Sequence, residues 1–285
     1  MLTHHIIGLE IGGIGISLNI ENLKIKNRLR IFYKNFISRR KPDIWIDAVG
    51  QNFLKPSLKS LILETPTWKL GKEHNSLFIY FPSSNPSLAS FNHTLNKIKF
   101  YTHDSSGQLL LYLFPEILFS LILPKNKGLL LHACGILNKK KGYLFVAKAG
   151  GGKSTIAKLA LKNGFIILND DRIILRKDKD LFRIYGSPWH GEVKSTENKS
   201  LPIKEIFFLR KAKSCYLKPI NKLEALEELL KNSFFLPINN DIIKKRFNLC
   251  VALVENLRCF KLYFRPEKSI WSLLNGDFKS YPQEK

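Results

Sequence analysis

A glycine cluster followed by Lys-Ser-Thr is the segment of this 285-residue chain best suited to chemistry. An apolar run at residues 143–147 leads into the cluster, and Lys153 then opens a helical pattern at residues 153–161. Glycines let backbone N–H groups point inward without Cβ interference, and a helix N-terminus adds partial positive charge. The Lys153 ammonium can reach the β- and γ-phosphates of a nucleotide, and the Ser154 hydroxyl can ligate Mg²⁺. The sequence therefore predicts a P-loop that binds ATP and Mg²⁺.

The predicted nucleotide-binding residues are Ala147, Ala149, Gly150, Gly151, Gly152, Lys153, Ser154 and Thr155. The full P-loop pattern has glycine at the position of Ala147, so the chain departs from the pattern there. The alternative interpretation is a glycine-rich turn between a strand and a helix, with an incidental Lys-Ser pair. The strand before the glycines and the helix after them favour the phosphate site.

Two adjacent carboxylates, Asp170 and Asp171, follow the predicted P-loop helix at the end of an apolar strand pattern at residues 165–168. Ligands of α/β folds gather at the carboxyl ends of strands, so we expect this pair to lie beside the phosphates. One carboxylate would belong to the Mg²⁺ shell, and the other would accept a proton from an attacking hydroxyl or water. An Asn-Asp-Asp cluster is also a common turn initiator at strand ends. Its position after a P-loop favours the catalytic interpretation.

Four motifs taken together resemble the catalytic domain of HPr serine kinases, whose P-loop is related to that of phosphoenolpyruvate carboxykinases. They are Leu131-His132-Ala133, the loop ending at Thr155, Asp170-Asp171-Arg172 and the segment from Pro188-Trp189 to Glu192. The closer resemblance is to the divergent HPr-kinase-like proteins of peptide-modification cassettes, and it covers about residues 128–195. Ala147 and Ala149 depart from the family, which has glycine at the first position and often serine at the second.

The resemblance implies a role for each central residue. Asp171 would activate the substrate hydroxyl, Asp170 would be a metal-side partner together with Ser154, and Lys153 would clamp the phosphates. His132 matches the family's active-site histidine. Without the resemblance, His132 would be interpreted as a satisfied core histidine on a buried strand.

The roles of four further residues stay open. Glu192 is either an additional metal ligand or a surface carboxylate. Trp189 either packs against the nucleotide or caps the core. Arg172 and Arg210 either neutralise charge in the transition state or only form ion pairs with carboxylates.

The resemblance implies a mixed α/β fold with a P-loop core of HPr kinase and phosphoenolpyruvate carboxykinase type, and the strand and turn composition of the first ~100 residues indicates a β-rich N-terminal half. It implies an ATP- and Mg²⁺-dependent kinase that transfers the γ-phosphoryl group to a Ser or Thr hydroxyl of a peptide or small protein. The alternative is a nucleotide-binding accessory protein of a peptide-modification system that phosphorylates nothing. A carboxykinase acting on oxaloacetate is disfavoured, because the sequence offers no further His or Lys set for a second metal.

The elements that must position the site lie in the second part of the chain. We expect a helix from residue 153 to about 164 and strands at residues 129–137, 143–147, 165–168 and 173–176. The first part is typical of strands and turns, with strand composition at residues 6–20 and 44–49 and a helix at residues 23–36. The predicted domains are a recognition or scaffold region at residues 1–105, a catalytic domain at 106–275 and a frayed tail at 276–285.

The chain is strongly basic, with 46 Lys plus Arg against 23 Asp plus Glu and a formal charge of +23. Such an excess favours an acidic acceptor peptide or protein. The basic residues are spread along the chain without a nucleic-acid-binding motif, so we expect no nucleic-acid partner. The alternative is a lysine-rich surface that only confers solubility.

Cysteine usage and hydropathy predict the location of the protein. The four cysteines include no Cys-x-x-Cys pair, which favours free thiols in the cytoplasm. The N-terminus lacks the basic start of a signal peptide. The most apolar segment, residues 109–123, is shorter than the ~20 residues of a membrane span and predicts a buried helix. We therefore expect a cytoplasmic protein without membrane contact, and an oligomer stays possible.

Overall fold

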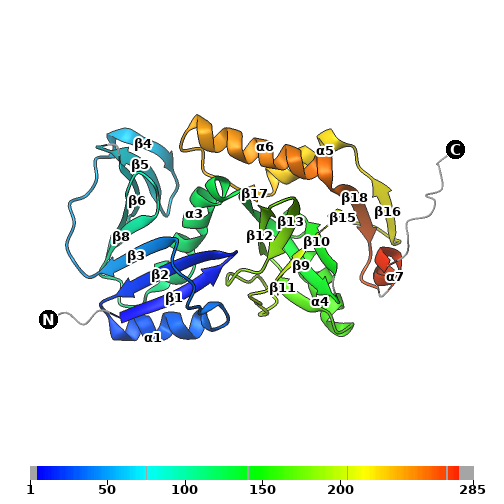
Figure 1. The fold of residues 1–285 in the computed structure, drawn as a ribbon, viewed down its shortest axis with the longest axis horizontal. Helices are drawn as coiled ribbons and strands as arrows, with labels where there is room; N and C mark the ends of the chain where they lie inside the picture. Colours follow the sequence, from blue (N-terminus) through cyan, green and yellow to red (C-terminus); the bar gives the residue numbers. More distant parts are fainter. Residues whose placement is uncertain (1–4, 75, 140, 204, 268, 276–285) are drawn as a thin grey trace. The chain divides into compact units, whose positions relative to one another are not determined.

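The computed structural model describes residues 5–74, 76–139, 141–203, 205–267 and 269–275, and the expected frayed tail at residues 276–285 lies outside them. The chain divides into two compact units, unit 1 (Met1–Ile122) and unit 2 (Leu123–Lys285). Each unit is built around one sheet that mixes parallel and antiparallel strands (Figure 1). The expectation of a mixed α/β chain is confirmed.

The described part of unit 1 forms an eight-stranded sheet in the order β1-β2-β3-β8-β7-β6-β5-β4. β2, β3 and β8 run parallel to one another at its centre, and the other neighbours pair antiparallel. The expected strand at residues 6–20 is a hairpin that turns at Gly12 and Gly13, because both have positive φ. The strands are β1 (His5–Ile11), β2 (Ile14–Ile20), β3 (Ile44–Val49), β4 (Leu61–Glu64), β5 (Lys69–Glu73), β6 (Ser76–Phe81), β7 (Ser87–Phe91) and β8 (Lys97–Thr102).

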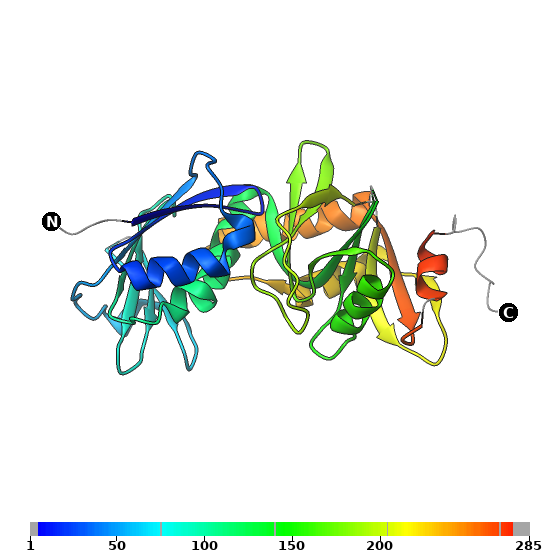
Figure 2. The same ribbon diagram turned by 90° about the horizontal axis from the view of Figure 1, so that it is seen from below.

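Three helices accompany this sheet: α1 (Leu23–Phe32), α2 (Gln108–Leu111) and α3 (Leu113–Ile122). Figure 1 and Figure 2 show α1, in blue, lying beside β1 and β2. The ring of Phe114 in α3 is fully buried, 4.7 Å from the ring of Phe100 and 6.4 Å from that of Phe91. Because α3 packs on this sheet, unit 1 extends to Ile122, whereas the expected boundary lay at residues 105–106. The apolar sequence of α3 does not indicate which sheet it covers.

The buried helix expected at residues 109–123 is two helices that are interrupted at Tyr112. Pro115 has no N–H group to donate to the carbonyl of Leu111, so a continuous helix would leave that carbonyl unpaired. The Tyr33 hydroxyl approaches the carbonyls of Leu110 at 2.8 Å and Leu111 at 3.2 Å. A remote side chain therefore supplies the donor that the local sequence lacks.

The described part of unit 2 forms a ten-stranded sheet in which β9 is central. β10 and β11 pair antiparallel with opposite sides of β9, and β15 and β18 continue parallel to β10. The carboxyl ends of β10, β11 and β15 therefore meet at one edge of the sheet. The strands are β9 (Gly128–Asn138), β10 (Lys141–Val146), β11 (Ile166–Asn169), β12 (Arg172–Asp178), β13 (Leu181–Tyr185), β14 (Ser200–Pro202), β15 (Glu205–Lys211), β16 (Tyr216–Pro219), β17 (Ser233–Phe234) and β18 (Arg258–Phe264).

Helices cover both faces of the unit 2 sheet (Figure 1). α4 (Lys153–Lys162) and α7 (Ser269–Asn275) pack on one face, together with Cys134 and Ile136 of β9. α5 (Lys222–Lys231) and α6 (Asn240–Asn256) pack on the other, together with Leu131 and Ala133. Alternation along β9 thus assigns its side chains to the two cores.

The four cysteines are free, as expected. Across the described residues, no helix is both long and apolar enough to cross a membrane.

We predict that Phe114→Ala lowers the free energy of unfolding of unit 1 by about 3–5 kcal/mol, because the change leaves a cavity between α3 and the sheet. Urea unfolding of the full chain, with hydrogen exchange to assign the loss to unit 1, measures this. Ile31→Ala on α1 is the control, because Ile31 is 73% exposed. Equal effects of the two changes would contradict the packing of α3 on this sheet.

Candidate functional site

The glycine loop, residues 147–152, connects β10 to α4 and requires its glycines. Gly150 and Gly152 have φ of 72° and 100°, where L side chains are strained. A Cβ on Gly152 would lie 2.5 Å from the ring of Phe264. A Cβ on Gly151 would lie 2.6 Å from the Cβ of Ala147. The methyl group of Ala147 therefore fits in this loop because residue 151 has no side chain.

The loop delivers backbone donors to the start of α4. Gly152 is the N-cap residue, and it has no side chain that could satisfy the first-turn N–H groups. Those groups and the helix dipole favour an anion at this position. Ser154 and Thr155 lie in the same first turn, and both are half-buried.

The Lys153 side chain folds back over the loop. Its Nζ donates to the carbonyls of Ala147 at 2.9 Å and Lys148 at 3.2 Å, and it lies 3.9 Å from Asp171 Oδ1. Burial lowers the pKa of Lys153, and the charge of Asp171 only partly offsets this effect. The ammonium is therefore held within the loop, poorly solvated and adjacent to a carboxylate.

Asp171 is surrounded by positively charged and hydrogen-bonding groups. Its Oδ1 lies 2.7 Å from His132 Nε2, and its Oδ2 pairs with the Arg172 guanidinium. Burial by itself raises the pKa of Asp171, but the hydrogen bond from His132 and the charges of Arg172, His132 and Lys153 outweigh it. The pKa of Asp171 therefore lies below its ordinary value, and the carboxylate is ionised at neutral pH.

His132 is brought to Asp171 by strand pairing. It lies opposite Arg172 in the register of β9 and β12. Its backbone N–H donates to the carbonyl of Asn232 at 2.7 Å. The side chain is 21% exposed, so it is not enclosed in the core. Phe234 of β17 lies beside both the imidazole and the Arg172 guanidinium, whose carbon is 4.1 Å from the ring centroid.

Asp170 has different surroundings from Asp171. It is fully buried, and its two oxygens accept the N–H groups of Gly191 at 2.8 Å and Val193 at 3.1 Å. A Cβ on Gly191 would lie 3.0 Å from Asp170 Oδ1 and from Asp171 Cβ. Asp170 thus fixes the segment at residues 191–193 against the acidic pair, and its role as a metal ligand stays a prediction.

Asn169 is a structural residue that the sequence reasoning missed. Its amide nitrogen donates to the carbonyls of Ser187 and Trp189, both at 3.0 Å, and its Oδ1 accepts the N–H groups of Asp171 at 2.7 Å and Arg172 at 2.8 Å. The signal was present, because Asn at a strand end often forms such a turn. The Asn-Asp-Asp cluster therefore forms the turn of the alternative interpretation, and its catalytic role stays a prediction.

The structure places the remaining expected residues outside this cluster or in ion pairs. Glu192 is exposed and pairs with Lys158 Nζ at 2.7 Å. Trp189 is 1% exposed, so its side chain packs in the core and is not placed to stack on a nucleotide. Arg210 pairs with Glu228 at 2.5 Å.

A cavity of about 560 Å³ adjoins the glycine loop. The end of β15 and one side of α5 complete its wall, and Asn232 links it to His132 through the backbone hydrogen bond. The lining includes four basic residues, which are Lys148, Arg210, Lys211 and Lys231, and one acidic residue, Glu228. The cavity therefore suits an anionic ligand.

Comparisons with known proteins add little. No protein-family model and no curated protein matches the chain. Among solved structures, the chain is similar to the HPr(Ser) kinase/phosphatase from Coxiella burnetii, with 13% identity and a TM-score of 0.25, over 42% of this chain and 87% of that one. A likeness this distant supports no conclusion about activity.

We predict that Asn169→Ala destabilises unit 2 by about 2–4 kcal/mol, because it leaves two buried carbonyls and two N–H groups without their partner. Hydrogen exchange should show faster exchange around residues 187–193, and the melting temperature should fall. Asn163→Ala is the matched control, since Asn163 makes one side-chain bond, to Leu159, at the end of α4. If both variants melt alike, Asn169 does not hold this segment.

Proposed function

We propose that unit 2 is an ATP- and Mg²⁺-dependent kinase that phosphorylates a Ser or Thr hydroxyl of a peptide or small protein. The observation that carries the proposal is the meeting of Lys153 and Asp171, with Nζ 3.9 Å from Oδ1, at the edge where β10 and β11 end. A phosphate-binding cation and an ionised carboxylate are the two groups that phosphoryl transfer requires at one place. We further propose that the core is of the HPr kinase and phosphoenolpyruvate carboxykinase type.

The glycine loop and α4 would bind the phosphates. Backbone N–H groups of the loop and the first turn point to an anion without reorganisation, which favours the developing charge of the transition state. Lys153 would exchange the carbonyls of Ala147 and Lys148 for phosphate oxygens. Because these carbonyls solvate the ammonium poorly, we expect little resistance to this exchange.

The donor set suits a Mg²⁺ ion that is bound mainly through the nucleotide. Among the described residues, no group of three or more His, Cys, Asp or Glu could hold a metal. In nucleotide sites Mg²⁺ takes only one or two carboxylates besides phosphates and water. Ser154 and Asp170 are the proposed ligands, and Glu192 would first have to leave Lys158. When bound, the metal neutralises charge on the phosphate oxygens.

Asp171 would orient the acceptor hydroxyl and take its proton. The imidazole N–H of His132 and the Arg172 guanidinium keep the Asp171 carboxylate ionised and fix its orientation. A low pKa makes it a weak base, which suffices because the transition state of phosphoryl transfer is loose and demands little early proton transfer. His132 and Arg172 thus act through Asp171.

The acceptor is proposed to be acidic. The basic cavity beside the glycine loop supports this proposal, as does the charge of the whole chain. Field lines from such a surface would speed the encounter with an acidic peptide.

The second candidate is a nucleotide-binding accessory protein without transfer activity. The observation that favours it is that Asp170 is fully buried with each oxygen accepting a backbone N–H group, which restricts the access of a metal to this carboxylate. Nucleotide binding without turnover by the unaltered protein, tested against acidic Ser- and Thr-containing peptides, would support this candidate.

We predict that Lys153→Ala removes most of the thermal stabilisation by Mg-ATP and nearly abolishes transfer, because it deletes the cation of the glycine loop. Differential scanning fluorimetry across a Mg-ATP titration measures the binding. Lys162→Ala is the control, because Lys162 is exposed and lies at the other end of the same helix. Intact stabilisation in Lys153→Ala would show that the loop is not the phosphate site.

We predict that Asp171→Asn retains Mg-ATP binding while turnover falls by ~10²–10⁴, since asparagine keeps the size of the side chain but cannot accept the proton. Transfer of labelled phosphate to a peptide, with binding measured in parallel, separates the two effects. An equal loss of binding and turnover would make Asp171 a metal ligand and assign the base role to Asp170 or His132.

A further inference from the structure

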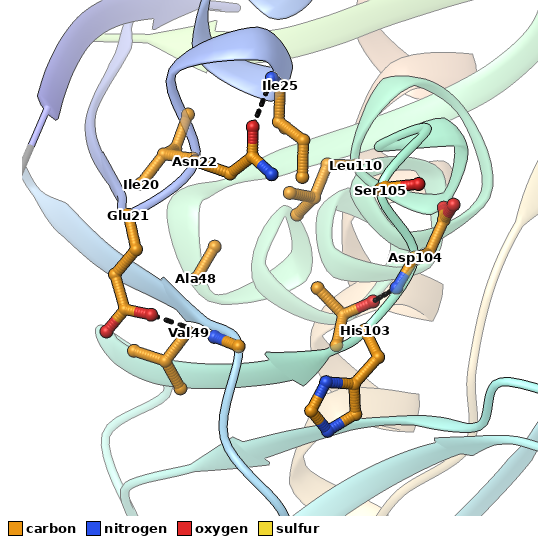
Figure 3. A pocket seen from close by; sticks show the side chains of 12 residues that line it. Ile20, Glu21, Asn22, Ile25, Ala48, Val49, His103, Asp104, Ser105 and Leu110 are labelled. Atoms are coloured by element: carbon orange, nitrogen blue, oxygen red, sulfur yellow. Dashed lines mark hydrogen bonds between the residues drawn. The ribbon is translucent and has the colours of Figure 1, made fainter.

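Unit 1 contains a cavity of about 330 Å³ at the ends of the parallel strands β2, β3 and β8 (Figure 3). Its two carboxylates, Glu21 and Asp104, lie on opposite sides of the lining and point apart. Glu21 accepts the N–H of Gly50 at 2.9 Å, and Asp104 accepts those of Ser106 at 2.8 Å and Gln108 at 3.1 Å. These carboxylates therefore stabilise the backbone at the ends of the strands, and their contacts do not indicate a ligand.

One aromatic side chain of unit 2, Phe234, lies against both partners of Asp171 and is not used by the proposed phosphoryl transfer. The carbon of the Arg172 guanidinium lies 4.1 Å from the centroid of the Phe234 ring, which is within the range of a cation–π contact. The imidazole of His132 lies 6.1 Å from the same ring, centroid to centroid, with the two planes inclined by 61°. His132 and Arg172 are the two groups that pair with the oxygens of the Asp171 carboxylate.

The backbone fixes the position of this ring relative to β9. Phe234 lies opposite Leu130 in the register of β17 and β9. Two residues earlier, the carbonyl of Asn232 accepts the backbone N–H of His132 at 2.7 Å. The ring and the imidazole are therefore both placed by the same stretch of β9.

A second arginine holds this segment from the side of α6. Arg246 donates to the carbonyl of Leu230 at 2.6 Å and to the hydroxyl of Ser233 at 2.7 Å. Its guanidinium carbon lies 4.3 Å from the centroid of the Phe235 ring. The two neighbouring rings thus each contact one arginine, and only Phe234 contacts an arginine of the candidate site.

The guanidinium of Arg172 uses different parts for its two contacts. One of its N–H groups donates to Asp171 Oδ2, while the ring of Phe234 covers a face of the planar group. An arginine side chain has several rotatable bonds, and fixing them costs conformational entropy. A contact on the face therefore restricts the guanidinium to the orientation in which it pairs with the carboxylate.

We propose that Phe234 is a positioning residue, whose ring holds Arg172 on Asp171 and thereby keeps the carboxylate oriented toward the acceptor hydroxyl. This inference deepens the proposed function and rests on the assignment of Asp171 as the residue that receives the hydroxyl. It requires an aromatic ring at position 234, because an aliphatic side chain of similar size offers no π face to the guanidinium.

The kinetic test compares Phe234→Leu with Phe235→Leu, a matched control that removes the neighbouring ring and its contact with Arg246. We expect Phe234→Leu to lower kcat about tenfold without changing the KM for Mg-ATP, because the phosphates bind at the glycine loop. Phe234→Tyr should restore kcat, since tyrosine keeps the ring face. Melting temperatures verify that the variants are folded. Equal losses of kcat in the two folded leucine variants, or no recovery with tyrosine, would overturn the proposal.

A double-mutant cycle tests whether Phe234 acts through Arg172. In the background of Arg172→Met, which removes the guanidinium, Phe234→Leu should lower kcat no further. A further loss as large as that in the unaltered background would overturn this route.

NMR of the full ¹⁵N-labelled chain tests the contact without any transfer reaction. The Nε–H signal of Arg172, assigned by its absence in Arg172→Lys, should be shifted upfield by the ring of Phe234. Phe234→Leu should remove this shift, and Phe235→Leu should leave it in place. If the unaltered protein transfers no phosphate, the kinase proposal fails, and this measurement still decides whether Phe234 positions Arg172. An Arg172 signal unchanged by Phe234→Leu would overturn the positioning role.

Discussion

The arrangement of unit 2 depends on β9, because this strand pairs antiparallel with β10 on one side and with β11 on the other. Two strands that both oppose a third must run in the same direction. The glycine loop after β10 and the acidic pair after β11 therefore lie at one edge of the sheet. β9 itself contributes His132 at that edge, since it runs the opposite way. No α-helical crossover between neighbouring strands is needed to assemble the site.

The candidate site brings together partly buried groups of opposite charge. Lys153 and Arg172 flank a single carboxylate, Asp171, and the ammonium of Lys153 is nearly inaccessible to water. Two cations and one carboxylate leave one excess positive charge, which a phosphate could compensate. Such compensation would also stabilise the charged form of Lys153, which burial disfavours. Burial lowers the pKa of Lys153, whereas the hydrogen bond from His132 and the neighbouring positive charges together lower the pKa of Asp171 against the opposing effect of its own burial.

The two units begin the helix that follows a parallel strand in different ways. In unit 2 the helix that follows β10 has Gly152 as its N-cap residue, so no cap side chain engages the first-turn N–H groups. In unit 1 the helix that follows β2 begins after Asn22, whose side chain accepts two first-turn N–H groups. One N-cap residue thus changes what the same topological position favours.

The sequence by itself indicated many of the elements and the main residues of the candidate site. Strand β3 and the start of α4 fall where composition and the glycine signals place them, because these signals act over a few residues. The sequence also determined that Lys153 and Asp171 follow β10 and β11. Only the tertiary structure decided that Asp171 meets His132 while Asp170 binds backbone N–H groups, because these partners lie far away in the sequence. It likewise decided which donor serves the carbonyls at the break near Tyr112, and it decided that α3 belongs to unit 1. Those outcomes depend on a distant hydroxyl and a distant aromatic cluster, which local patterns cannot encode.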